Sequence, residues 1–564
     1  MADFYWGTAT ANFNSANWST SAGAGPYNAG PPTGSDNAHF NAASTSGTCT
    51  LSADTSITTL DMTSNGGTVL ALTSHNLTLS GNLTMSGTNA HLTATSGGIM
   101  IINTGTGTIT SNGSTFPGTM NFNGANGTYT LSGNLSVSGL VTCSVSVTVN
   151  HTTSETMTLS GGLTLTYNLA GTAALIFNGG TWSGAGNLNM AWSVSSGGVT
   201  LGSAVSTQSY LTGNTGTLAF ATYLMTLSAT SFTLYGTTSC TTPSAGTGGI
   251  KLTSTTGCTA AFNGTHLGGA LVLDMTASKV LTLANGGLAC VVNGLVTVST
   301  TTTLTPTTTE SLSANYGITM GAAMSGTAVI NIAGAMTSSG AGDVLSCPLN
   351  FNGNFSFGGV LYYSGGPITW TAGVDGTTGT VASHSLFLSA ATTLSWNGVT
   401  LVNVWSGNNL TMTTGSAISV TNWLMAWDGQ ISQTINGGYT ITVANLQYTP
   451  SGTGTLTFAA GTIINVTNSL YLASTANLPG TLGTNYVGTV KSGTSSSPIY
   501  LYYTGAAGNC TSWAFIFTDV TNTNGVAGAA GTPILNYGPS SLLTRTAGIT
   551  PYTAANMVNQ IGVV

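Results

Sequence analysis

The sequence predicts an all-β protein, a right-handed parallel β-helix built from coils of about 25 residues. Three observations lead to this prediction. Only 3% of the 564 residues are charged, against about 25% in a typical soluble domain, so too few charges exist for solvent-facing helices. Apolar and small polar residues alternate along much of the chain. The same Gly/Asn corner between short apolar runs also returns many times.

The clearest example of the alternation is the segment 77–85, with the sequence LTLSGNLTM. Its Leu and Met residues are expected to point inward around a Gly-Asn corner. Alternation with a period of two, rich in β-branched Thr and broken by Gly and Asn, is typical of short strands and tight turns. Similar segments occur at 131–137, 159–165, 186–190, 286–288 and 408–412.

The spacing of these corners indicates a solenoid. Gly81, Gly133, Gly161 and Gly186 are separated by 52, 28 and 25 residues, each near a multiple of about 25. A unit of this length holds two or three short strands, whereas a propeller blade needs about 40–50 residues and four strands. Ladders of Thr, Ser and Asn between stacked coils stabilise without charge, which explains the composition.

The two ends of the chain differ from the middle. Residues 1–48 are predicted to form an N-terminal cap or attachment segment, in which Trp6, Trp18 and Phe40 close the open end of the repeats. Residues 49–484 form the predicted β-helix body. Residues 485–564 form a C-terminal cap, rich in aromatic residues between 500 and 517, and an arm after Pro551.

Four short segments stand out near the two ends of the chain, namely FYWG at 4–7, NWS at 17–19, DNAHF at 36–40 and FTDV at 517–520. They resemble the opening and closing segments of Gly/Thr-rich β-helical proteins that are common in bacteriophage genomes. Bacterial surface and autotransporter-like proteins share this opening. The resemblance implies a β-helix in a virion or on a cell surface and transfers no active site. It also implies a homotrimer, and we expect the C-terminal region, including the arm after Pro551, to make the contacts between subunits. A monomer docked on the particle through its N-terminal cap is the alternative.

Composition excludes several other classes of function. The basic residues Lys251, Lys279, Lys491 and Arg545 are isolated, so no nucleic-acid surface is predicted. No apolar run reaches the roughly 18–20 residues of a membrane span, and the first residues lack a secretory signal, which favours a phage protein over a secreted adhesin. No His or Cys spacing predicts a metal site, and no cofactor is expected.

The seven cysteines are scattered along the chain. Cys240 and Cys258 flank a Gly/Ser/Thr loop, and a single disulfide between them is one interpretation. The other interpretation is that the cysteines are buried free thiols.

No catalytic residue is predicted. A glycan-cleaving enzyme needs two carboxylates about 5–10 Å apart, and only Asp54 with Asp61, or Asp375 with Asp428, could supply such a pair. Isolated acids in these places are more typical of turn caps. We therefore expect a protein that is not an enzyme.

A cluster of tryptophans is the strongest candidate for a binding surface. Exposed indole rings stack on sugars, so the cluster predicts a glycan site, whereas core packing or contacts between subunits are the other interpretation. The residues of the predicted glycan site are Trp370, Trp396, Trp405, Trp423, Trp427 and Asp428.

Together these observations predict a structural protein at the surface of a bacteriophage particle, either a tail fibre or spike or a fibre that decorates the head. Its expected partners are other virion proteins and a glycan of the host surface. Two alternatives stay open, namely a bacterial cell-surface adhesin or secreted matrix protein, and a tailspike that depolymerises glycans.

Overall fold

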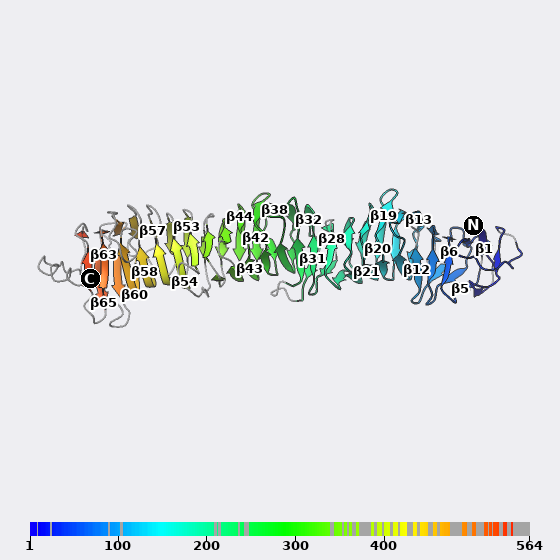
Figure 1. Ribbon diagram of the computed structural model, residues 1–564, viewed down its shortest axis with the longest axis horizontal. Helices are drawn as coiled ribbons and strands as arrows, with labels where there is room; N and C mark the ends of the chain where they lie inside the picture. Colours follow the sequence, from blue (N-terminus) through cyan, green and yellow to red (C-terminus); the bar gives the residue numbers. More distant parts are fainter. Residues whose placement is uncertain are drawn as a thin grey trace. The chain divides into compact units, whose positions relative to one another are not determined.

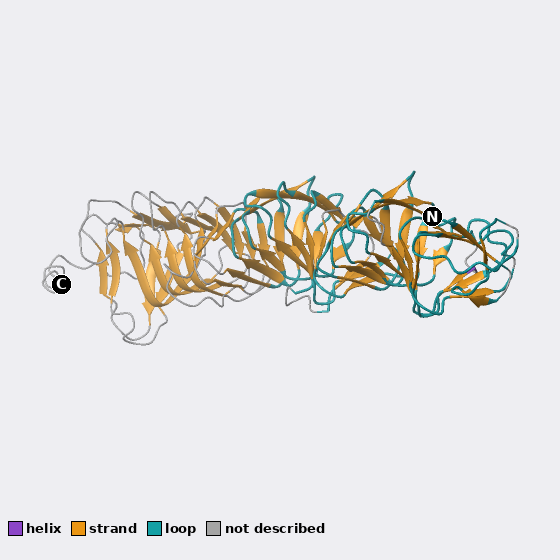
Figure 2. Ribbon diagram, turned by 45° about the vertical axis from the view of Figure 1, so that its right-hand side comes forward, coloured by secondary structure: helices purple, strands orange, loops and turns teal. Residues whose placement is uncertain are grey.

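The computed structural model describes residues 1–7, 10–22, 25–44, 46–87, 91–101, 105–207, 211–212, 216–234, 237–241, 247–338 and 343–351. After residue 351 it describes strand segments, from β49 (Phe355–Phe357) to β67 (Leu543–Thr544), with few of their side chains. These regions consist of strands and short loops, and the one helical position among them is a 3₁₀ residue at His91 (Figure 2). No helix in these regions is long and apolar enough to cross a membrane.

The chain divides into two compact units, Met1–Val296 and Thr297–Val564. In the first unit, successive coils contribute one strand each to three parallel sheets (Figure 1). One such coil contains β13 (Thr106–Thr110), β14 (Thr115–Phe116) and β15 (Thr119–Phe122). Each of these strands pairs in parallel with its equivalent in the next coil, which contains β16 (Thr128–Ser132), β17 (Leu135–Val137) and β18 (Val141–Cys143). The predicted right-handed parallel β-helix is confirmed.

Inward-facing side chains form columns along the interior of the coil stack. Leu60, Leu83, Ile109 and Leu131 occupy one register column through four coils, and each is at most 1% exposed. Burial of each such side chain contributes about 1.5–3 kcal/mol. Because every coil adds residues to these columns, the core grows with the number of coils rather than with the width of the molecule.

The outer face carries neutral polar ladders, as the composition requires. Thr108, Thr130 and Asn150 share one column on the opposite face of the same strands and are partly exposed. Asn side chains within or next to the strands accept hydrogen bonds from backbone N–H groups of the next coil. Four such bonds measure 2.8–3.2 Å, namely Thr108 N to Asn82, Thr156 N to Asn134, Thr172 N to Asn150 and Asn187 N to Asn168.

The coils are shorter than the predicted 25 residues in most places. Register partners lie 26 residues apart between Leu83 and Ile109, but 18 apart between Gly317 and Ala335. The difference arises because the Gly/Asn motif occurs at more than one of the turns within a coil. Gly133 follows a strand of one sheet and Gly161 follows a strand of another, so their spacing does not measure a whole coil. Gly133 has a φ of 89°, a conformation that a side chain would strain.

The parallel stack begins earlier in the chain than residue 49. Strand β1 (Asp3–Trp6) pairs antiparallel with β3 (Trp18–Ser19) and in parallel with β4 (Asn37–His39). Strand β4 then pairs in parallel with β7 (Thr59–Asp61), which belongs to the following coil. The N-terminal segment is therefore joined to the body by a continuous sheet.

In the second unit, the strands first come three to a coil, as in β41 (Thr302–Pro306), β42 (Ser311–Ala314) and β43 (Gly317–Met320). From β50 (Val360–Tyr363) onward the named strands come two to a coil, since β50 pairs with β52 (Ser385–Leu388) directly. This parallel pairing continues to β67. The predicted arm after Pro551 lies outside the described residues.

Candidate functional sites

The aromatic residues of the predicted N-terminal cap come together in one buried cluster. Trp6, Trp18 and Phe40 are at most 1% exposed, with ring centroids 5.0–6.1 Å apart. Phe13, which the sequence did not single out, packs edge-on against Trp18 at 4.9 Å, and its carbonyl oxygen accepts a hydrogen bond of 2.8 Å from Trp18 Nε1. These rings hold β1, β3 and the residue that follows β4 in one apolar unit.

An Asp–His–Asp cluster crosses three strands beside these rings. His39 Nε2 lies 3.2 Å from Asp3 Oδ1, and His39 Nδ1 lies 3.3 Å from Asp61 Oδ2. The three residues come from β1, β4 and β7. Tyr5 stacks on the imidazole with centroids 4.9 Å apart, because Tyr5 and His39 are register partners.

The electrostatics of this cluster favour a charged imidazole. The hydrogen bond to Asp61 raises the pKa of His39, against the opposing effect of burial. The same hydrogen bond lowers the pKa of Asp61 to about 2, helped by hydrogen bonds from Thr63 N and Oγ1 at 2.9 and 2.7 Å. Asn37 and His39 together lower the pKa of Asp3. Both imidazole nitrogens are engaged by carboxylates, so the cluster is built to tie strands together rather than to activate a nucleophile.

The carboxylates considered for glycan cleavage have separate partners. Asp61 binds His39 and Thr63, whereas Asp54 accepts a hydrogen bond of 2.8 Å from Asn76 N and lies 3.6 Å from His75 Nδ1. Each acid therefore ties its own strand or turn to a neighbouring coil. Asp375 and Asp428, the other pair, lie outside the described residues.

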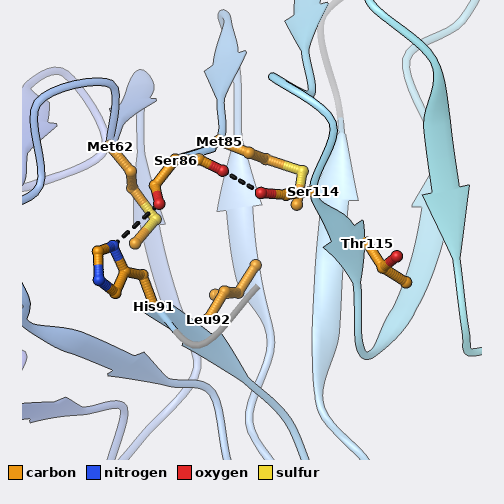
Figure 3. Close-up of a pocket in the computed structure, with 7 residues that line it drawn as sticks. All are labelled: Met62, Met85, Ser86, His91, Leu92, Ser114 and Thr115. Atoms are coloured by element: carbon orange, nitrogen blue, oxygen red, sulfur yellow. Dashed lines mark hydrogen bonds between the residues drawn. The ribbon is translucent and has the colours of Figure 1, made fainter. Parts of the chain in front are cut away.

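A small cavity in the first unit contains a serine and a histidine (Figure 3). Ser86 Oγ lies 2.9 Å from His91 Nδ1, and the Ser114 hydroxyl donates to the Ser86 carbonyl oxygen. The cavity volume is about 10 Å³, close to the least that one water molecule needs. Ser86 is only 6% exposed, so this pair has no room for a substrate. The bond from Ser114 to the Ser86 carbonyl oxygen joins two neighbouring coils.

The predicted tryptophan site is only partly within the described residues. Trp423, in β56 (Ile418–Met425), is 1% exposed and belongs to the core, so its ring is closed to a sugar. Trp370 and Trp396 are register partners in β51 (Ile368–Trp370) and β53 (Thr392–Trp396), while Trp405 pairs with Leu424 in a different sheet. The structure thus divides these residues between two sheets. Trp427 and Asp428 lie outside the described residues.

The cysteines in the described part of the chain are free thiols, including Cys240 and Cys258. Burial raises the pKa of Cys143, Cys258 and Cys347 to about 12, which is typical of thiols that act as small apolar residues. Within the same regions, no group of three or more His, Cys, Asp or Glu side chains is arranged to hold a metal ion.

No family model, curated protein or solved structure matches this chain.

Proposed function

We propose that this chain is a non-enzymatic structural protein on the surface of a bacteriophage particle, as a tail fibre, a spike or a fibre that decorates the head. The observation that carries the proposal is the parallel solenoid with neutral Thr, Ser and Asn ladders on its outer columns. Such ladders need neither metal nor cofactor to hold their shape, which suits a protein exposed outside cells.

The contacts of the acidic residues support a structural role. Asp3, Asp61 and Asp54 bind histidines or backbone N–H groups of neighbouring strands and turns. Glu155 binds the hydroxyl and N–H groups of Thr152 and Thr153 at 2.6–2.8 Å and thereby holds a turn. Acids used in this way tie strands and turns to their neighbours, which supports a structural role.

Mass spectrometry of purified particles tests the proposal. Particles from a culture that carries the gene should contain the chain in a fixed ratio to the major capsid protein. Detection in the outer-surface fraction of the cells and not in the particles would replace the proposal with the adhesin or matrix-protein alternative.

The depolymerase alternative has its own test. It predicts halos on lawns of capsulated host cells spotted with the purified chain, and their loss in the Asp428→Ala variant. Under our proposal the purified chain forms no halo.

We further propose that the chain assembles as a homotrimer through its C-terminal region. Light scattering of the full-length chain at micromolar concentration should give three times the mass of 56.3 kDa, and deletion of residues 551–564 should lower that mass. A monomer at this concentration would refute the trimer while leaving the role in the particle intact.

A further inference from the structure

An apolar register column crosses five successive coils of the second unit. It runs from β47 (Asp343–Leu345) through β50 and β52 to β54 (Thr400–Ser406) and β56. Neighbouring strands of a parallel sheet lie about 4.8 Å apart, so the column is about 19 Å long. Its members are Val344, Tyr362, Phe387, Trp405 and Leu424.

Burial at the two ends of the column places it on the outer face of the sheet. At the first end, Val344 is partly exposed, whereas its neighbour Leu345 is 1% exposed. At the other end, Trp423 is 1% exposed, and Leu424 follows it on the opposite face because successive residues of a strand alternate between faces. Since register partners share a face, the three residues between these ends also lie on the outer face.

The rest of this outer face is polar. In earlier coils of the same sheet, Thr303 and Ser325 share an outer column, with their hydroxyl oxygens 3.1 Å apart. Within β56, Ser419 is exposed, and the alternation shifts once between Val420 and Trp423, which are both buried. An apolar centre with a polar border is the usual anatomy of an interface between proteins, and a continuous apolar patch on an outer face marks such an interface.

The charge and the repeat of this region favour a second copy of the chain as the partner. Residues 344–471 include Asp375 and Asp428 but no Lys, Arg or Glu, so attraction between opposite charges is not what selects the partner. A second copy in parallel alignment presents the same apolar residues in the same order and with the same spacing from coil to coil. Cyclic symmetry about an axis along the coil stack brings this column of every copy to that axis.

We propose that this apolar column docks a second copy of the chain in parallel alignment, with Trp405 and Leu424 at the centre of the interface. The inference rests on the proposed function, for which it names a contact between copies of the particle protein. It adds a surface within the β-helix body to the proposed contacts of the C-terminal region. Of the residues predicted to bind a glycan, it assigns Trp405 to the contact between copies.

Light scattering of the full-length chain at micromolar concentration tests the proposal. The wild type should give a multiple of 56.3 kDa, and Leu424→Lys should weaken the association at least tenfold, because the interface would strip water from an unpaired charge. Ser419→Lys is the matched control, since Ser419 is an exposed residue of the same strand, and it should change the association less than about twofold. Circular dichroism should show the same strand content in all three proteins.

Cross-linking provides a second measurement that introduces no charge. Packed sheets lie about 10 Å apart, so a short bismaleimide should join two copies of Leu424→Cys into a covalent dimer. Ser419→Cys lies five residues earlier in the same strand, about 16 Å away, and should give far less dimer. The wild type, with its own cysteines, measures the background.

A monomeric wild type would overturn the inference, and so would equal association in Leu424→Lys and Ser419→Lys. If Leu424→Lys does not fold, equal cross-linking of the two cysteine variants would overturn it instead. A chain that is found in particles but associates equally well in Leu424→Lys would refute the column and leave the proposed function standing. Copies that cross-link through Leu424→Cys in a chain absent from every particle would do the reverse.

Discussion

Replacement of His39 by Gln should loosen the N-terminal strands β1 and β4 and remove the pH dependence of their attachment near neutrality. His39 joins β1 to β7 through Asp3 and Asp61, and its pKa is raised in the folded protein. The stability it contributes is therefore complete below its unfolded pKa of about 6.5 and is lost as the pH rises through the raised value. Asp61 has a lowered pKa, so its contribution is present above about 4 and is lost as the pH falls toward 2. Attachment of β4 to β7 should accordingly be strongest between about pH 4 and 6.5.

The magnitude follows from the pKa of Asp61. A fall from 3.8 to about 2 corresponds to roughly 2.4 kcal/mol at about 1.36 kcal/mol per pH unit. Asp61 and Asp3 are 37% and 52% exposed, so solvent screening reduces the expected contribution to about 1 kcal/mol. Because Asp61 lies on β7 and contacts His39 on β4, opening of β4 from β7 should become about fivefold more frequent in His39→Gln at pH 5.5.

Hydrogen–deuterium exchange of the amides in β1 and β4 measures this opening, with protection factors corrected for the intrinsic rate at each pH. Wild-type protection should fall between pH 6 and 9, and the variant should show the lower protection throughout. His75→Gln is the control, because His75 lies 3.6 Å from an exposed Asp54 and belongs to none of these strands. Equal pH dependence in the wild type and His39→Gln would refute this reasoning.

Three further outcomes can be checked on the same protein. Leu83→Ala should reduce the free energy of unfolding by about 2–4 kcal/mol, whereas Thr84→Ser, on the outer face of the same strand, should change it by less than about 0.5 kcal/mol in denaturant titrations. Gly133→Ala should lower the midpoint of thermal unfolding, because Gly133 has a φ of 89°, and an unchanged midpoint would contradict this. Iodoacetamide should leave Cys258 unmodified in the folded protein, since burial raises its pKa to about 12, and should modify the less buried Cys240 first, as peptide mass spectrometry would show.

The fold class was predictable because alternation and composition act locally in every coil. Leu77, Leu79 and Leu83 were expected to face inward, and all three are at most 1% exposed. The length of the coil was less predictable, because Gly/Asn corners with the same chemistry occur at different corners of one coil. A Gly/Asn pattern predicts that the chain turns. It does not predict which sheet the next strand joins, because that depends on the pairing of that strand.

Candidate sites were harder to predict, because they depend on register between coils. The partners of His39 lie 36 residues earlier and 22 residues later, and no local motif joins Asp3 and Asp61 to it. The exposed fraction of an aromatic side chain was equally hard to predict from the sequence. Trp423 was predicted to belong to a glycan site but is 1% exposed, whereas Tyr316, in the turn after β42, is 47% exposed. A shift of one residue in a strand moves every side chain to the opposite face, so aromatic content alone cannot locate a binding surface.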